Sequence, residues 1–138
     1  MADNKTLRLT VITPSRAVFD ADAKAVVAPA FDGELGVLPG HAALLALLGT
    51  GELRVTTVDG ATKRMAIRGG FLQINKNVMT VLTPESQSAE EIKIDVVNSE
   101  LEKLAGEHVT KLDEREAQEG KRAWIKARQK LAQPVAKH

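Results

Sequence analysis

The chain has 138 residues and a formal net charge of +1, and 43% of its residues are hydrophobic, which suits one compact unit with or without a small appendage. The absence of cysteine excludes disulfides and thiolate metal sites, and a near-neutral charge with only three Phe and one Trp gives no reason to expect nucleic acid. The longest nearly apolar run, 42–48, is too short to span a bilayer, and residues 1–5 lack the pattern of a signal peptide. We therefore expect a soluble protein.

The first part of the chain, up to residue 83, has the pattern of short β-strands, with apolar side chains at alternate positions. Such runs occupy residues 7–11, 25–28, 52–58, 62–67, 71–74 and 78–82. Asp59-Gly60 between two of them predicts a hairpin with a type I′ turn, in which both turn residues take positive φ. Residues 75–77 predict a second hairpin. Many short strands separated by turn residues favour a flattened β-sandwich or barrel.

After Pro84 the period changes to that of helices. Ser88 and Glu91 fit a capping box, and Asp95 is an alternative N-cap. A stripe at helical spacing follows and can end at Gly106; its members are Ile94, Val97, Leu101 and Leu104.

A second helix is predicted to begin at a capping box over residues 113–116 and to stop before Pro134. Its apolar stripe comprises Ala117, Gly120, Trp124, Ala127 and Leu131. The short link predicts an antiparallel helical hairpin. The fold class is therefore mixed β then α, with a flattened sandwich over 1–86 and a two-helix hairpin over 87–138. Because the second stripe has only two large side chains, the hairpin is expected to be weakly tied to the rest.

Charge is segregated within the helical part. Residues 85–119 carry 11 acidic and four basic side chains, whereas residues 120–138 carry six basic and no acidic ones. The acidic and basic parts can pair with each other, or the basic end can bind an acidic partner; the basic helix can also be simply a solvated face. The candidate residues are Lys121, Arg122, Lys126, Arg128 and Lys130.

The sequence offers no catalytic or metal-binding motif. Its three histidines are widely separated and form no pair with metal-ligand spacing. The serines lie in no nucleophile-elbow context. The five glycines of residues 31–55 do not make a phosphate loop, because no Lys follows them and Glu34 and Glu52 would repel phosphate. We expect these glycines to make turns and bulges at strand ends.

The same stretch carries a resemblance to a known family. FDGELGVLPGHA at 31–42 and GELRV at 51–55, with GGF at 69–71 and NVMTVL at 77–82, resemble the ε subunits of F-type ATP synthases. The resemblance extends over nearly the whole chain in length and order of elements. Ala43 stands where the family often has proline.

This resemblance implies a non-catalytic subunit of the rotor stalk, which couples proton-driven rotation to ATP synthesis. It implies that the sandwich contacts the γ subunit and the c-subunit ring, and that the hairpin either folds on the sandwich or extends along γ and obstructs ATP hydrolysis. The implied location is the cytoplasmic face of a bacterial inner membrane, peripheral to it, or alternatively the stromal face of a thylakoid.

Two groups of contact residues follow from the resemblance. The loop that would face the c ring and γ contains Glu34, Gly36, Pro39, Gly40 and His41. The basic residues of the second helix would meet an acidic segment of the β subunit, and possibly of α.

Some bacterial members of this family bind ATP through an Ile/Leu-Asp-x-x-Arg-Ala motif. This chain keeps Ile94 and Asp95 but has Asn98 in place of the arginine. Without that guanidinium the bidentate phosphate donor is missing, so we expect weak or absent ATP binding and no cofactor.

Two other function classes remain open from sequence. One is a free-standing β-sandwich module that binds protein, with a dimerising or docking hairpin. The other is an enzyme acting alone, which the lack of motifs disfavours.

Overall fold

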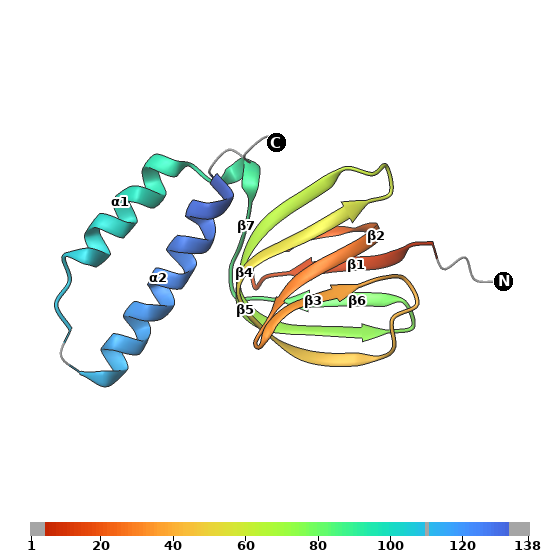
Figure 1. The fold of residues 1–138 in the computed structure, drawn as a ribbon, viewed down its shortest axis with the longest axis horizontal. Helices are drawn as coiled ribbons and strands as arrows, with labels where there is room; N and C mark the ends of the chain where they lie inside the picture. Colours follow the sequence, from red (N-terminus) through yellow and green to blue (C-terminus); the bar gives the residue numbers. More distant parts are fainter. Residues whose placement is uncertain (1–4, 110, 133–138) are drawn as a thin grey trace.

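The computed structural model describes residues 5–109 and 111–132 (Figure 1). The sandwich strands are β1 Leu7–Ile12, β2 Ala17–Ala30, β3 Gly33–Val37, β4 Leu44–Thr57, β5 Thr62–Asn75, β6 Val78–Leu82 and β7 Ser86–Ser88. A 3-10 helix, η1 Ala89–Glu91, leads to α1 Ile94–Ala105 and α2 Leu112–Ala132. The two α-helices stand side by side at one end of the strands, as Figure 1 shows. Pro134, expected to stop the second helix, lies outside the described residues.

The strands close on themselves. Their hydrogen-bonded order is β1-β6-β5-β4-β2-β3, and β1 also pairs with β2, so that five strands form a ring. The β1–β6 pairing is parallel and the other pairings are antiparallel. β3 extends the ring at β2, and β7 adds to β5. The expected fold class, a flattened β-sandwich followed by an antiparallel two-helix hairpin, is confirmed.

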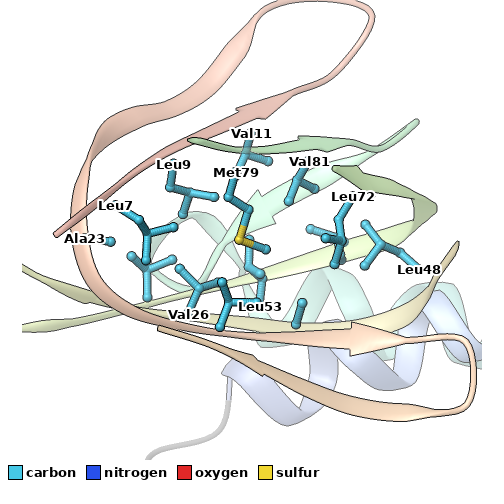
Figure 2. Close-up of a cluster of buried hydrophobic side chains, with 14 of the residues drawn as sticks. Leu7, Leu9, Val11, Ala23, Val26, Leu48, Leu53, Leu72, Met79 and Val81 are labelled. Carbon is cyan, nitrogen blue, oxygen red and sulfur yellow. The ribbon is translucent and has the colours of Figure 1, made fainter. Parts of the chain in front are cut away.

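The main core lies between the two layers of the sandwich (Figure 2). All of its fully buried side chains come from β1 to β6. Figure 2 labels Leu7, Leu9, Val11, Ala23, Val26, Leu48, Leu53, Leu72, Met79 and Val81. Burial of each Leu-sized side chain is worth about 1.5–3 kcal/mol. No helical residue belongs to this core, so its buried side chains pack only against other strands of the sandwich.

In both β4 and β5, the residues that face the core change between even and odd positions, and the change occurs where the two strands lie opposite each other. In β4 the core residues switch from even to odd positions between Leu48 and Leu53, and in β5 they switch back to even between Ile67 and Leu72. Leu48 pairs with Gly70 at the switch. Gly70 has a φ of 110°, a backbone conformation that other residues rarely adopt. The strands thus bend across the edge of the sandwich without losing their pairing.

The two predicted hairpins exist, but one turn type was wrong. At Asp59-Gly60 only the glycine has positive φ, 88°, and Thr57 accepts a hydrogen bond from Gly60 N at 2.9 Å. Asp59 keeps negative φ, while its carboxylate accepts bonds from the Thr57 hydroxyl and from Ala61 N. This matches a type I turn followed by a glycine bulge. Positive φ at two successive turn residues occurs instead at Lys76 and Asn77.

The glycine-rich stretch is more regular than expected. Gly33–Val37, expected as turns and loop, forms strand β3, because Leu35 and Val37 alternate toward the core while Glu34 and Gly36 face outward. The apolar run 42–48 mostly belongs to β4, which begins at Leu44.

The helix starts also differ in detail. Ser88 and Glu91 make the predicted capping box, but it caps η1, and α1 begins at Ile94 with Lys93 as N-cap. Asp95 therefore lies in the first turn, as does Asp113 of α2. Gly106 ends α1 as predicted.

A second, smaller core joins the helices to the sandwich. It comprises Ala66, Ile92, Val97, Leu104, Trp124, Ile125 and Leu131. The predicted α2 stripe was partly wrong: Ala117 is exposed, whereas Ile125 and Arg128 are buried. α2 packs against β4 and β5. Neither described α-helix combines the length and apolar character needed to cross a membrane.

We predict that Gly70→Ala destabilises the sandwich by more than about 2 kcal/mol in urea unfolding, because strain at a positive φ adds to a steric clash. A Cβ built at this position would lie 1.9 Å from the Leu82 carbonyl oxygen. Gly36→Ala is the matched control, since its Cβ would meet no atom within 4 Å. Equal stability of the two variants would contradict this account of the bend.

Candidate interaction sites on the sandwich and the helical hairpin

Pro39 and Gly40 form the tip of a tight turn between β3 and β4. His41 N donates to the Leu38 carbonyl at 3.1 Å, and Gly40 has a φ of 85°. Proline at the second position and glycine at the third is the residue pattern of a type II turn. His41 is half-buried, and its Nδ1 donates to the Ala42 carbonyl at 2.8 Å. Pro39, Gly40 and His41 thus form one small, defined surface feature.

Asn77 fixes this turn to the neighbouring β5–β6 hairpin. Its Oδ1 accepts from Gly40 N at 2.8 Å, and its Nδ2 donates to the Thr6 carbonyl at 2.6 Å. The Asn77 carbonyl also accepts from Arg8 N at 3.1 Å. One side chain therefore joins three segments. The β3–β4 and β5–β6 turns lie at the end of the sandwich away from the helices, as Figure 1 shows. Sequence reasoning placed Asn77 in a turn and in the NVMTVL segment of the resemblance, but it assigned no contact to the side chain; the available signal was an asparagine at a turn, where this residue often takes positive φ.

Glu34 does not lie with that turn. It stands near the start of β3, and about 10 Å of extended strand separates it from Val37 at the other end of β3. The Glu34 carboxylate pairs with Arg54 Nη1 at 3.2 Å. Gly36 lies between these points, exposed within the strand. Of the loop residues inferred from the resemblance, Glu34 and Gly36 therefore lie in β3, whereas Pro39, Gly40 and His41 lie together in the turn that follows it.

Arg54 connects Glu34 to a further carboxylate. Its Nη1 also lies 3.1 Å from Glu52 Oε1, and the hydrogen bond to Glu52 is the main reason that the pKa of Arg54 is raised. Glu52 also accepts from Arg64. Glu34, Arg54, Glu52 and Arg64 thus form a ladder of alternating charge across β3, β4 and β5, which orients Glu34 without isolating it from solvent.

A strip of exposed apolar side chains crosses the outer face of β4, β5 and β6 and continues onto the β2–β3 turn, where Phe31 N donates to the Leu47 carbonyl at 3.0 Å. We call it the apolar strip; it consists of Phe31, Leu45, Leu47, Phe71 and Leu82, which are 49% to 79% exposed. Leu47 pairs with Phe71, and Phe71 pairs with Leu82, so these three side chains are direct neighbours. Phe71 and Leu82 also line a groove of about 450 Å³ beside Ile12 and Pro84. Contiguous exposed apolar surface of this kind marks an interaction site.

The basic residues of α2 fall into two groups. Lys121, Arg122, Lys126 and Lys130 are exposed, as a docking surface requires. Arg128 is only 6% exposed and faces the interior of the hairpin.

Arg128 is held by α1 and by its own helix. Its Nη1 and Nη2 donate to the two carboxylate oxygens of Glu100 at 2.8 and 2.9 Å, and its Cζ lies 5.1 Å from the centre of the Trp124 ring. The hydrogen bond from Arg128 is the main reason that the pKa of Glu100 is lowered. A bidentate pair of this geometry is among the stronger polar contacts in proteins.

The degenerate nucleotide motif is engaged in contacts between the helices. Asn98 accepts a hydrogen bond from Gln129 Nε2 at 3.0 Å, while Asp95 is exposed and Ile94 half-buried. The nearby guanidinium of Arg128 already binds Glu100. No group of three or more potential metal ligands occurs within residues 5–109 and 111–132.

The sandwich and its curated relatives define the class of this protein. Residues 6–89 match the family model described as ATP synthase, Delta/Epsilon chain, beta-sandwich domain. The ATP synthase epsilon chain of Synechococcus sp. (strain WH7803) is 37% identical over 126 residues, or 91% of this chain and 89% of that one. The epsilon chain of Pelotomaculum thermopropionicum is 43% identical over 91 residues, covering 66% of this chain and 67% of that one.

Solved structures share the fold. A chain of the Euglena gracilis mitochondrial ATP synthase, in an OSCP/F1/c-ring structure, matches with a TM-score of 0.80 at 23% identity, covering 92% of this chain and 81% of that one. A chain of the Tetrahymena thermophila mitochondrial ATP synthase central stalk and c-ring matches with a TM-score of 0.71 at 16% identity, covering 96% and 100%. On the family-model match and the epsilon-chain relatives together, the chain belongs to the ATP synthase epsilon chain family.

We predict that Asn77→Gly frees the turn at Gly40 while keeping the backbone conformation, because glycine tolerates the φ of 65° but has no side chain to bind Gly40 and Thr6. Amide exchange at Gly40 should accelerate roughly tenfold, the factor that corresponds to a net hydrogen-bond loss of about 1.4 kcal/mol. Exchange at Gly60, in another turn, serves as the internal control. Unchanged exchange at Gly40 would refute the anchoring role of Asn77.

We also predict that millimolar ATP leaves the thermal unfolding of the isolated chain unchanged, because Asn98 stands in place of the motif's arginine and the nearby Arg128 is bound to Glu100. A ligand present at 100 times its Kd would stabilise the folded state by about 2.7 kcal/mol, which a thermal shift assay detects easily. ADP and magnesium alone are the controls. A saturable upward shift with ATP would overturn this prediction.

Proposed function

We propose that this chain is a non-catalytic subunit of the central rotor stalk of an F-type ATP synthase, where it couples proton-driven rotation to ATP synthesis. The observation that carries the proposal is the apolar strip on a sandwich whose core is already complete. Phe71 and Leu47 are not needed to fill that core, yet they stay exposed side by side. A partner protein that covers them supplies the burial that the chain alone does not.

In this proposal the apolar strip receives the γ subunit, and the turn at Pro39-Gly40-His41 meets the c-subunit ring. The turn suits a contact under torque because its backbone is tied to Asn77 and through it to β1 and β6. Glu34, oriented by Arg54, adds a carboxylate at a separate point of the same stalk surface. The two contacts would transmit rotation from the ring to γ through the rigid sandwich.

We further propose that residues 1–86 and 87–138 act as separate units, the second of which regulates hydrolysis. The hairpin docks through a small core, and α2 places only a few large side chains in it. An element held this weakly can leave the sandwich and extend along γ toward the catalytic head, where it would obstruct ATP hydrolysis. Exposed Lys121, Arg122, Lys126 and Lys130 would then meet an acidic segment of β, and possibly of α, in a salt-sensitive contact.

The proposed location is peripheral, on the cytoplasmic face of a bacterial inner membrane, with the stromal face of a thylakoid as the alternative. The competing function is a free-standing protein-binding module whose apolar strip or hairpin docks another partner. A pull-down from detergent extract separates the two functions: recovery of ATP synthase subunits supports the first, and their absence supports the second.

We predict that a chain ending after Ser88 still joins the complex and that ATP hydrolysis by this complex rises several-fold over that with the full chain. The end point keeps β7 paired with β5. Co-purification of the shortened chain with γ is the control for assembly. If the shortened chain assembles and hydrolysis does not rise, the inhibitory part of the proposal is wrong.

We predict that Phe71→Ser weakens binding to γ by more than about tenfold, because loss of a central apolar anchor costs more than about 1.4 kcal/mol. Val58→Ser is the matched control: Val58 is 52% exposed, but it lies in the β4–β5 turn outside the apolar strip. The measurement is the Kd of each folded variant for the γ subunit. Equal affinities for the two variants would place the γ contact elsewhere.

A further inference from the structure

Among the residues that the structure describes, Arg128 is the charged residue that is buried in the hairpin. The other basic side chains singled out on α2 are exposed, whereas Arg128 is 6% exposed where α1, α2 and the sandwich meet. It lines one cavity of about 300 Å³ with Arg68 and Lys121, and another of about 430 Å³ with Arg16. Burying a guanidinium is unfavourable unless a partner compensates its charge. The hairpin therefore stays closed only while a negatively charged group compensates the charge of Arg128.

Glu100 is the partner that the geometry assigns. Four carboxylates line the cavities beside Arg128, those of Glu85, Glu91, Glu100 and Glu107. Glu85 pairs with Arg68 at 2.8 Å, and Glu91 accepts from the backbone and hydroxyl of Ser88. Of these carboxylates, Glu100 is the one that makes a bidentate contact with Arg128, at 2.8 and 2.9 Å.

The pair is asymmetric. The Arg128 side chain is 8% exposed, while that of Glu100 is 42% exposed. Among the described residues, Arg128 Nε is a buried donor with no hydrogen-bond partner. The guanidinium thus depends on one partly solvated carboxylate that belongs to the other helix, and any separation of α1 from α2 removes it.

Arg128 also shares a face of α2 with Lys121. The two residues are seven positions apart, close to two full turns, and both line the same cavity. If α2 leaves α1, this face presents two cations about 10 Å apart. An acidic helical segment with carboxylates two turns apart matches that spacing.

We propose that the Glu100–Arg128 pair locks the closed hairpin, and that on opening Arg128 exchanges Glu100 for a carboxylate of an acidic partner segment. This inference rests on the proposed movement of the hairpin and adds the residue pair that controls it. Glu100 occupies in the closed state the position that the partner's carboxylate takes in the open one. Removing Glu100 therefore opens the hairpin and leaves Arg128 ready to bind, whereas removing Arg128 opens it without that binding group.

The lock is tested first in the full chain alone. Glu100→Gln should raise amide exchange in α2 roughly tenfold, since hydrogen bonds to charged groups shift an equilibrium by at least that factor. The single tryptophan, Trp124, is buried and should shift its emission to the red. Glu102→Gln, on an exposed residue of α1, is the matched control for lost charge.

Exchange in β1 and β6 separates local from global effects. Unchanged exchange in these strands with faster exchange in α2 supports the lock. Equal exchange in the Glu100→Gln and Glu102→Gln variants refutes it. Acceleration of strands and helices by the same factor also refutes it, because the pair would then stabilise the whole chain and not the closed hairpin.

The exchange step is tested in the assembled complex by comparing Glu100→Gln with Arg128→Gln. Both variants should open the hairpin of the isolated chain, but only Glu100→Gln should lower ATP hydrolysis below that of the complex with the unaltered chain. Equal hydrolysis with the two variants would overturn the exchange. The chain ending after Ser88 separates a failure of the proposed inhibition from a failure of the Glu100–Arg128 lock. If the complex with this shortened chain hydrolyses ATP no faster, the inhibitory function is wrong. Amide exchange in the isolated chain still shows whether the pair holds the hairpin closed.

Discussion

The contact on which the rest of the structure depends is the close approach of Gly70 to the backbone of β6. No side chain fits between Gly70 and the Leu82 carbonyl, and the φ of 110° suits glycine alone. This contact lets β5 cross from one layer of the sandwich to the other while it stays paired on both sides. Because side chains alternate along a strand, the crossing decides which residues face the core.

Both candidate surfaces of the sandwich follow from that crossing. Before it, Ala66 faces outward and receives the helices. After it, Leu72 turns inward, and Phe71 joins Leu47 on the outer face. The change between odd and even core positions thus gives β5 two outward surfaces. One part of the strand packs against the hairpin, and another carries part of the apolar strip. Because these two surfaces do not overlap, the proposed partner contact and the proposed movement of the hairpin are compatible with each other.

The strands with clear alternation could be predicted from sequence, and so could both hairpins and the helical end at Gly106, because these depend on local periodicity and turn residues. β3 and the start of β4 could not, since the glycines of β3 also suit turns and the continuous apolar run 44–48 shows no alternation of apolar and polar residues. Arg128 was grouped with exposed cations because a charge within an apolar stripe gives no sign of its partner 28 residues away. Asn77 was missed because its contacts reach 37 and 71 residues along the chain.

The central claim is that the hairpin moves while the sandwich stays fixed, and a distance between the two tests it most directly. The chain has no cysteine, so Lys24→Cys in β2 and Glu119→Cys in α2 give two unique labelling sites, both exposed. Double electron–electron resonance on spin labels at these sites would then be measured in the isolated chain and in the assembled, hydrolysing complex. The account predicts one distance in the isolated chain and a second, longer one in the complex. A single unchanged distance in both would contradict it.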